Sequence, residues 1–274
     1  MPNPATVHAR LLEWYAASAR DLPWRRTRDP YAILVAEIML QQTQVDRVIP
    51  KWLAWLERFP TLADLATASR ADAIRAWQGL GYNLRAVRLH AIAVQAAADC
   101  GGELPRDVPG LLRLKGIGRY TAGAVACFAY EQPVAMVDTN VRRVLSRVFG
   151  WPASAVDDLA ESVLPASAAY AWNQALMDLG ATLCRARRPL CLACPLVVDC
   201  GGPGAPARSP GAATGQFTGS RRYHRGRIIQ RLRELPAGQA LPLSEFGDRR
   251  DLVRQLATEG LVRIDPDERV RLAD

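Results

Sequence analysis

The chain has 274 residues, of which 49% are hydrophobic and 23% charged, the balance of a globular protein with a core of useful size. Collagen-like, mucin-like and wholly disordered chains are excluded, and the apolar stretch 31–40 is interrupted by Glu37 and falls short of the roughly 18 residues of a membrane span. Basic residues number 35 against 27 acidic ones, and the net charge of +8 fits a nucleic-acid partner. Residues 1–10 contain no apolar signal core, so we expect a cytoplasmic, nucleoid-associated protein.

Helical periodicity dominates residues 5–200. Apolar residues recur there at spacings of three and four, and Gly, Pro and Asp separate the runs. No convincing alternation of apolar and polar residues precedes residue 240, so the first 200 residues are predicted to form an all-α domain. The predicted helices span residues 11–19, 31–42, 45–59, 62–66, 71–77, 85–98, 111–114, 120–130, 139–148 and 173–179.

The C-terminal part has a different composition. Residues 201–220 contain six Gly and three Pro with almost no large apolar side chain, which predicts a mobile linker. A basic amphipathic helix is expected over 221–235 and a second helix over 249–259. Residues 261–264 and 269–272 alternate around a turn at 265–268, which predicts a β-hairpin. Helices followed by a hairpin indicate a small winged-helix-like module at 221–274.

Two interpretations of this basic tail are open. It could be a solubilising appendage, or its arginines could add contacts to DNA phosphates. The arginines concerned are Arg221, Arg222, Arg225 and Arg227.

Four of the six cysteines lie within 17 residues. In a chain with no export signal, clustered cysteines are more often metal ligands than disulfides. The spacing alone leaves an iron–sulfur cluster, a structural zinc and free thiols open. The pattern is Cys184-x6-Cys191-x2-Cys194-x5-Cys200.

Residues 112–122, LRLKGIGRYTA, have the form of a helix-hairpin-helix in which two short helices meet at Gly116-x-Gly118. Glycines let the backbone turn sharply and approach a partner closely. The free N–H groups at the start of the second helix can hold a phosphate, whatever the base sequence. For a lone G-x-G, a helix–helix turn without a ligand would be the default interpretation, but the flanking pattern makes the signal more specific.

Two carboxylates stand in unusual surroundings. Glu37 lies in the apolar run AILVAEIML at 32–40, where a carboxyl is either paired for structural reasons or kept partly protonated by desolvation. The second state suits a general acid. Asp138 precedes the helix predicted at 139–148 and is most simply an N-cap, although a capping Asp can also face a ligand.

Several motifs spread over residues 5–200 carry a resemblance to a known family. They are LPWR at 22–25, EIMLQQTQV at 37–45, GLGY at 79–82, GIGRYTAGA at 116–124, VDTNVRRV at 137–144, NQALMDLGA at 173–181 and the cysteine cluster. Together they resemble the helix-hairpin-helix DNA glycosylases, and within these the MutY-type adenine glycosylases. The cysteine spacing matches the [4Fe–4S] loop of that family, which favours an iron–sulfur cluster over zinc.

The resemblance implies an all-α glycosylase fold of two helical subdomains. A six-helix subdomain would span about 30–132, and residues 1–29 and 133–200 would form the iron–sulfur subdomain, ahead of the linker and the tail. The partner would be double-stranded DNA, with no membrane, and the protein would be a monomer. Many such enzymes carry a Nudix-like C-terminal domain that helps recognise 8-oxoguanine. Here the short basic tail is expected instead, which leaves the preference for 8-oxoguanine open.

The resemblance also assigns roles. Glu37 would be the catalytic acid that protonates a flipped adenine at N7, and Asp138 would stabilise the oxocarbenium-like sugar, a division of labour also seen in glycoside hydrolysis. Asn140 and Tyr120 would complete the base pocket.

Other positions concern the DNA and the reaction type. Gln42 and Tyr82 would act at the gap left by the base and at the opposite base. Endonuclease III-like bifunctional enzymes carry a lysine where this chain has Tyr120, so a monofunctional glycosylase is predicted. Thr139 stands where many relatives have Gly, and the residue at Asn83 also differs from the common pattern.

Two rival functions are open. A thymine or uracil mismatch glycosylase of the same superfamily can also carry a Tyr at this position, although the QQTQ stretch at 41–44 favours adenine. A non-catalytic iron–sulfur DNA-binding protein would use only the hairpin and the cluster, and the presence of both Glu37 and Asp138 argues against it.

Overall fold

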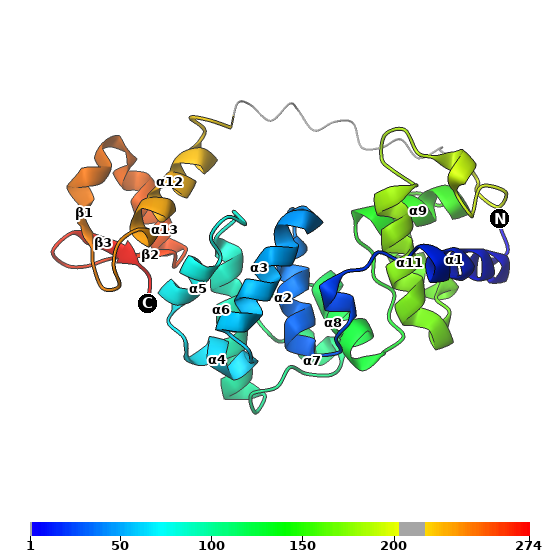
Figure 1. The fold of residues 1–274 in the computed structure, drawn as a ribbon, viewed down its shortest axis with the longest axis horizontal. Coiled ribbons are helices and arrows are strands. Elements are labelled where there is room, and N and C mark those ends of the chain that lie inside the picture. The colour runs from blue at the N-terminus through cyan, green and yellow to red at the C-terminus, as the bar shows by residue number, and fades with distance from the viewer. Residues whose placement is uncertain (1, 203–216) are drawn as a thin grey trace. The chain divides into compact units, whose positions relative to one another are not determined.

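The computed structural model describes residues 2–202 and 217–274, and helices form most of it (Figure 1). Two compact units can be separated by their internal contacts: a first unit of residues up to 33, 106–112 and 118–202, and a second unit of residues 34–105, 113–117 and 217–274. The predicted linker lies largely in 203–216, outside the described residues. The domain boundaries drawn from the sequence stay a prediction.

The first unit contains the N-terminal helix and most of the helices between residues 106 and 202. Its helices are α1 (Pro4–Ser18), α7 (Val108–Leu112), α8 (Arg119–Tyr130), α9 (Thr139–Phe149), α10 (Val156–Leu159) and α11 (Ala169–Thr182), with 3-10 turns at Pro23–Arg25, Ala160–Val163, Ala166–Ala168 and Cys191–Ala193.

The second unit holds the remaining helices and a small sheet. Its elements are most of α2 (Pro30–Leu40), then α3 (Val45–Arg58), α4 (Leu62–Thr67), α5 (Arg70–Ala76), α6 (Leu84–Asp99), α12 (Arg221–Arg233), β1 (Leu241–Pro242), a 3-10 segment (Leu243–Arg249), α13 (Arg250–Thr258), β2 (Val262–Ile264) and β3 (Arg269–Leu272).

Periodicity located nearly all of these helices, and the predicted all-α fold with a small C-terminal sheet is confirmed. The largest boundary errors are at α1, which begins at Pro4 behind an Asn3 cap, and at α11, which begins at Ala169 and not at 173; α7 begins at Val108 and not at 111. The Asp107 carboxylate accepts from the Gly110 N–H at 2.6 Å, which explains the earlier start of α7. Pro50 lies inside α3.

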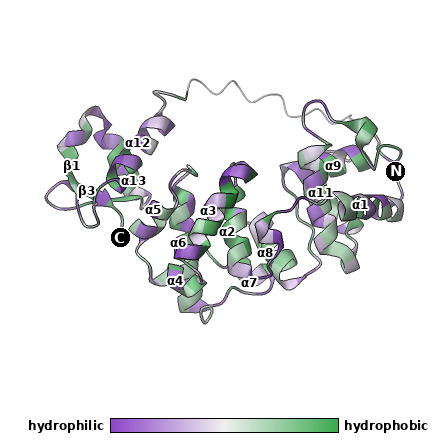
Figure 2. Ribbon diagram, in the orientation of Figure 1, coloured by the Kyte–Doolittle hydropathy of each residue, from purple (hydrophilic) through white to green (hydrophobic). Residues whose placement is uncertain are grey.

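The core of the first unit is built from α1, α9 and α11. Leu11, Val144 and Trp172 are almost fully buried in one apolar cluster, and the sequence spacing of three and four on each helix brings such residues to one face. Figure 2 shows the apolar stripes on these helices, and it shows α2 apolar along most of its length.

A buried carboxylate joins the segment after α1 to α11. Asp178 is 0% exposed and accepts from Arg20 Nε at 2.6 Å and from both terminal nitrogens of Arg25 at 2.8 Å. Burial raises the pKa of Asp178, but the hydrogen bonds from Arg25 and Arg20 outweigh it and hold the pKa below its ordinary value of 3.8. The ion pairs therefore fix the LPWR turn against the NQALMDLGA helix.

The tail folds as predicted, with one addition. The hairpin of β2 and β3 pairs Val262 with Leu272 and Ile264 with Val270, and β1 joins as a third antiparallel strand on the other side of β3. The sequence did not reveal β1 because it is two residues long and one of them is Pro242. The order of elements and the sheet agree with a winged-helix-like module.

No helix within residues 2–202 and 217–274 combines the length and the apolar character that crossing a membrane requires.

Asp178→Asn tests the buried ion pairs. Because the folded-state pKa lies below 3.8, ionised Asp178 stabilises the fold above that pH, and the contribution is lost as the pH falls through the folded-state pKa. We expect the variant to lose about 3–5 kcal/mol of unfolding free energy at neutral pH, and the difference from wild type to shrink below about pH 4. Denaturant titrations at several pH values measure this. The exposed Asp157→Asn, which removes the partner of Arg142, should cost under about 1 kcal/mol; equal losses in the two variants would contradict the assignment.

Candidate active site

Glu37 lies in the middle of α2 and is 5% exposed. The residues on either side of it in α2, Ala36 and Ile38, are also buried. The predicted burial of this carboxyl is therefore confirmed, and its role as an acid stays a prediction.

Arg85 holds the end of the Glu37 helix. The side chain is 4% exposed and donates from Nη1 to the carbonyl oxygens of Ile38, Met39 and Gln41 at 3.0, 2.8 and 2.6 Å. These carbonyls end α2, where no intrahelical donor remains. Burial lowers the pKa of Arg85 to about 10, so the guanidinium is charged at neutral pH.

The same guanidinium also reaches two loops. Its Nη2 donates to Thr43 Oγ1 at 3.0 Å and to the carbonyl oxygens of Leu80 and Gly81 at 3.1 and 3.2 Å. One buried side chain thus joins the helix of Glu37 to the loops of Gln42 and Tyr82. Sequence reasoning missed Arg85, although an arginine on the apolar face of the helix at 85–98 was a usable signal.

Gln42 and Tyr82 are exposed and line the same cleft of the second unit. Both have a positive φ, 56° and 45°, which is uncommon for residues with a side chain and is retained where the surroundings hold it. The hydrogen bonds of Arg85 to Gln41 and Gly81, the residues immediately before them, supply that constraint. The structure therefore brings together the two residues expected at the gap and at the opposite base.

The glycine hairpin has the expected backbone. Gly116 has φ +107°, which a residue with a side chain adopts only with strain, and a Cβ added there would lie 3.6 Å from Arg88 and 3.7 Å from Ile92 of α6. Gly118 is the extended residue at the start of α8, and no side chain caps that helix. Both glycines are exposed. The phosphate contact expected at this hairpin stays a prediction.

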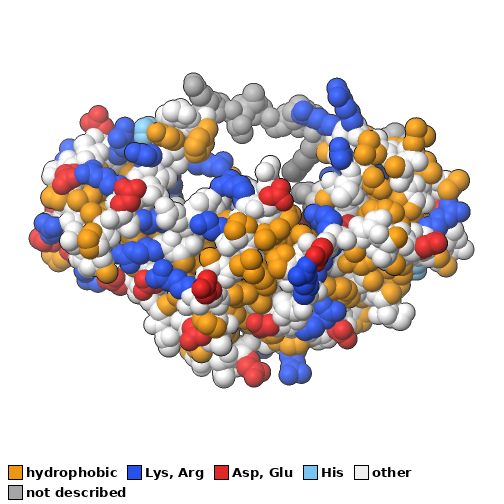
Figure 3. All heavy atoms as spheres, in the orientation of Figure 1, with side chains coloured by type: hydrophobic (Ala, Val, Ile, Leu, Met, Phe, Trp, Pro, Cys, Tyr) orange, Lys and Arg blue, Asp and Glu red, His pale blue; other side chains and the backbone are white. Residues whose placement is uncertain are grey.

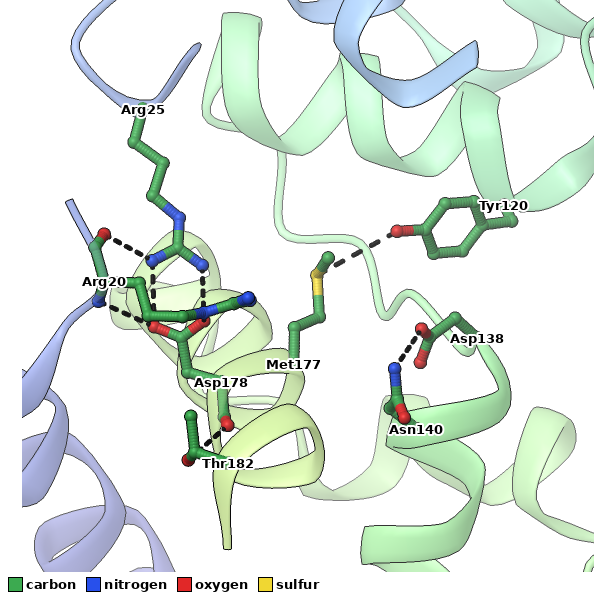
Figure 4. Close-up of polar contacts among 8 residues, drawn as sticks. All are labelled: Arg20, Arg25, Tyr120, Asp138, Asn140, Met177, Asp178 and Thr182. Carbon is green, nitrogen blue, oxygen red and sulfur yellow. Dashed lines mark hydrogen bonds and ion pairs between the residues drawn. The ribbon is translucent and has the colours of Figure 1, made fainter. Parts of the chain in front are cut away.

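Asp138, Asn140 and Tyr120 lie in the first unit (Figure 4). Asp138 caps α9: one carboxylate oxygen accepts from the Val141 N–H at 2.7 Å and the other from Asn140 Nδ2 at 3.2 Å. The Tyr120 hydroxyl donates to the Met177 sulfur at 3.9 Å. Asp138 is thus an N-cap, as the simpler interpretation holds, and it is half-buried, as is Tyr120; the ligand contacts expected of both stay predictions.

Two further side chains hold this group in place. Asn173 accepts from the Met136 N–H and donates to the Val134 carbonyl, which fixes the segment leading to Asp138. Arg143 donates to Asn140 Oδ1 at 2.8 Å and to the Gly180 and Cys184 carbonyls. Both lie in motifs that carried the resemblance, but their long-range partners could not be inferred from the sequence.

Gly180 allows α11 to approach α9 at Asn140. A Cβ added at Gly180 would lie 2.7 Å from the Cβ of Asn140, closer than real side chains come. The glycine of the NQALMDLGA motif is therefore needed for the backbone approach that places Asn140.

All four cysteines of the cluster motif line one apolar cavity of about 140 Å³ in the first unit. Arg147 lies at its edge, with Nη1 3.4 Å from Cys184 Sγ. Among residues 2–202 and 217–274, no set of three or more His, Cys, Asp or Glu side chains is arranged to hold a metal ion. Four thiols around an apolar cavity, with an arginine at its edge, fit a thiolate-bound anionic group. The four side chains are Cys184, Cys191, Cys194 and Cys200.

Comparisons with known proteins agree with this geometry. Residues 35–165 match the family described as HhH-GPD superfamily base excision DNA repair protein. The chain is 44% identical to the adenine DNA glycosylase of Mycolicibacterium smegmatis, with 96% of this chain and 94% of the relative covered. A solved thermostable thymine-DNA glycosylase has a TM-score of 0.69 at 32% identity, covering 73% of this chain and 96% of its own. A solved endonuclease III–DNA complex has a TM-score of 0.63 at 24% identity, with the same coverage, which supports the fold.

The fold, the glycine hairpin and the family match define a helix-hairpin-helix DNA glycosylase. With near-complete coverage of its mycobacterial relative, the chain belongs to the adenine DNA glycosylase family of the HhH-GPD superfamily. The resemblance found in the sequence is thereby confirmed, and so is the predicted class of enzyme. The individual site residues stay predictions.

Arg85→Met tests the connection between α2 and the two loops. Removing the guanidinium leaves buried carbonyl oxygens without donors, so we expect a loss of about 2–4 kcal/mol in the free energy of unfolding, measured by denaturant titration. Arg88→Met removes a charge from an exposed position on the same helix and should cost under about 0.5 kcal/mol. A loss in Arg85→Met no larger than in Arg88→Met would show that the hydrogen bonds do not hold the loops.

Proposed function

We propose that the protein hydrolyses the N-glycosidic bond of adenine mispaired with 8-oxoguanine or guanine in duplex DNA. The observation that carries this is the pair of differently placed carboxylates, Glu37 buried in an apolar helix and Asp138 held at the start of α9, in a chain of the adenine DNA glycosylase family. The partner is double-stranded DNA, and the protein acts as a monomer.

The two carboxylates divide the chemistry. The glycosidic bond is out of reach within the stack, so the adenine is first flipped out of the duplex. Glu37 donates a proton to N7 of the base, which makes it a better leaving group. Asp138 keeps a negative charge that favours the cationic sugar of the transition state, and water completes the hydrolysis.

The remaining predicted residues act on the base and the strands. Tyr120 and Asn140 line the base pocket, next to the carboxylate of Asp138. Gln42 and Tyr82 enter the gap that the base leaves and contact the opposite base. Gly116 and Gly118 hold a phosphate of the backbone through the hairpin N–H groups.

The reaction stops at the abasic site. Strand cleavage by a bifunctional glycosylase requires an amine that attacks the sugar, and a phenol at position 120 cannot form a Schiff base. The chain has two lysines, Lys51 and Lys115, and neither occupies the position of the family's nucleophile.

A [4Fe–4S] cluster is the cofactor proposed for the cysteine cavity. Cys184, Cys191, Cys194 and Cys200 would hold its four irons, and Arg147 would offset part of the negative charge. When bound, the cluster would stabilise the segment after α11 by holding its four cysteines together. No catalytic step is assigned to it.

Thymine or uracil removal opposite guanine is a second candidate, favoured by one observation. The thymine-DNA glycosylase has a TM-score of 0.69 and shares 32% of aligned residues with this chain. The adenine assignment is preferred because the relative matched over nearly the whole chain is an adenine DNA glycosylase.

Single-turnover cleavage distinguishes the substrates. Duplexes with adenine opposite 8-oxoguanine, adenine opposite guanine, and thymine or uracil opposite guanine are incubated with excess enzyme, with and without alkali. We expect rapid release of adenine opposite 8-oxoguanine, with strand breaks seen only after alkali. Cutting confined to thymine or uracil would overturn the adenine assignment, and breaks without alkali would overturn the monofunctional one.

Glu37→Gln tests the acid. The amide keeps the size of the side chain but cannot supply the proton, so excision should fall by at least about 100-fold while duplex affinity changes little. Rates under single-turnover conditions and fluorescence anisotropy with the same duplex measure the two quantities. Unchanged excision would remove Glu37 from the mechanism and favour a structural role.

Cys191→Ser tests the cluster. We expect the variant to lose iron, acid-labile sulfide and the broad visible absorption of the purified protein, because one of four ligands is gone. Cys100→Ser, at a thiol outside the cavity, should keep all three. Equal iron content in the two variants, or purification with zinc and no sulfide, would overturn the proposal.

A further inference from the structure

The C-terminal module is attached to the rest of the second unit through a half-buried arginine and an apolar contact. Arg233 of α12 donates from Nε to the Ile74 carbonyl at 2.9 Å and from Nη2 to Asn83 Oδ1 at 2.8 Å. Ile74 belongs to the same apolar cluster as Ile229 and Leu232 of α12. The module is therefore held directly beside Asn83, the residue that follows Tyr82.

This attachment forms a cleft of about 730 Å³ between α12 and the loops that carry Gln42 and Tyr82. None of the described residues that line it is acidic. A channel lined by arginines, with no carboxylate in its lining, attracts phosphate groups. Its arginines are Arg47, Arg85, Arg88, Arg222, Arg225 and Arg233.

Two of these guanidinium groups lie over the aromatic ring of Tyr82. Arg222 of α12 lies 4.4 Å from the centroid of the Tyr82 ring, and Arg85 lies 5.6 Å from it. Arg222 is exposed and forms none of the ion pairs found within the described residues. A cation over an aromatic ring favours one orientation of the ring, and an exposed guanidinium can bind a phosphate at the same time.

We infer that the C-terminal module and the Gln42 and Tyr82 loops together form a binding site for the phosphate backbone of the strand opposite the adenine, in which Arg222 also positions Tyr82. The choice of strand rests on the proposed function, because Gln42 and Tyr82 are the residues assigned there to the gap and the opposite base. The backbone of that strand passes beside the residue that contacts its base, and the cleft begins at Tyr82.

The four arginines that the sequence singled out in the tail are therefore not equivalent. Arg222 and Arg225 line the cleft, although Arg225 is paired with Glu259, and Arg221 bonds to Gln255. Arg227 lies on another face of α12, in a cavity that also contains Glu245. Figure 3 shows several basic side chains of the tail on the face in view.

Arg222→Ala and Arg227→Ala form a matched pair, because both remove one exposed charge from the same helix. Each is made in the full chain carrying Glu37→Gln, so that the duplex is not cut during binding measurements. Anisotropy with an adenine:8-oxoguanine duplex is recorded over a range of salt concentrations. We expect Arg222→Ala to weaken binding about tenfold and to reduce the salt slope by about one, and Arg227→Ala to change affinity less than about twofold.

Hydroxyl-radical footprinting identifies the strand. Arg222→Ala should lose protection on the strand opposite the adenine, while Arg227→Ala keeps it. Equal behaviour of the two variants, or a loss confined to the adenine strand, would overturn the inference. Thermal unfolding of both variants checks that the fold is intact, which the exposure of both side chains leads us to expect.

A double-mutant cycle with Tyr82→Ala tests the positioning role. If Arg222 acts partly through the ring, the two losses in affinity will be less than additive. Full additivity would remove the positioning role.

The outcome for the cleft is separate from the outcome for catalysis. If the wild-type chain releases no adenine but Arg222→Ala still loses protection on one strand, the proposed function fails and the cleft stands. If adenine is released and the matched variants behave alike, the cleft alone fails.

Discussion

The buried guanidinium of Arg85 is the constraint on which the candidate site of the second unit depends. It sits among carbonyl oxygens and a hydroxyl and satisfies the end of α2 and two loops at once. Carbonyl dipoles take the place of the lost hydration of the charge, and the fork of an arginine reaches groups that a lysine, with a single nitrogen, could not span. Positive φ at Gln42 and Tyr82 is maintained because the two terminal nitrogens of this guanidinium bind the residues immediately before them.

The first unit contains the reverse arrangement, in which a buried negative charge is bound by positively charged groups. There a buried carboxylate, Asp178, receives two arginines and fixes the turn at 22–25. The two proposed catalytic carboxylates contrast with it and with each other. Glu37 is buried in an apolar helix, whereas Asp138 accepts hydrogen bonds from the helix N-terminus that it caps and from the Asn140 amide. The two carboxylates therefore differ in burial and in hydrogen bonding, as the proposed division of roles requires.

Local sequence pattern was sufficient to predict most helices and the β-hairpin of the tail, because periodicity and capping act within a few residues. The motifs could be found in the same way, because each is a short continuous stretch. What could not be predicted are contacts between distant parts of the chain: Arg85 to the end of α2, Arg143 to Gly180, and Arg233 to Ile74. From the sequence alone, a charged residue within a helical pattern is expected to face solvent, because its distant partners are not visible there. The same holds for Gly180, whose importance follows from the approach of α9.

The tail is the element for which composition was least informative. Net positive charge is equally compatible with a solubilising appendage and with a DNA contact, but an appendage has no reason to bury an arginine against another part of the chain. Burial lowers the pKa of Arg233 to about 10, a desolvation cost that its hydrogen bonds to Ile74 and Asn83 must offset. This contact fixes α12 beside Asn83, the residue that follows Tyr82, and Arg222 of the same helix lies over the Tyr82 ring. A loop whose backbone is held by Arg85 and whose side chain is held by Arg222 has little conformational entropy left to lose when DNA binds, so the same contacts that order the loop also favour the complex.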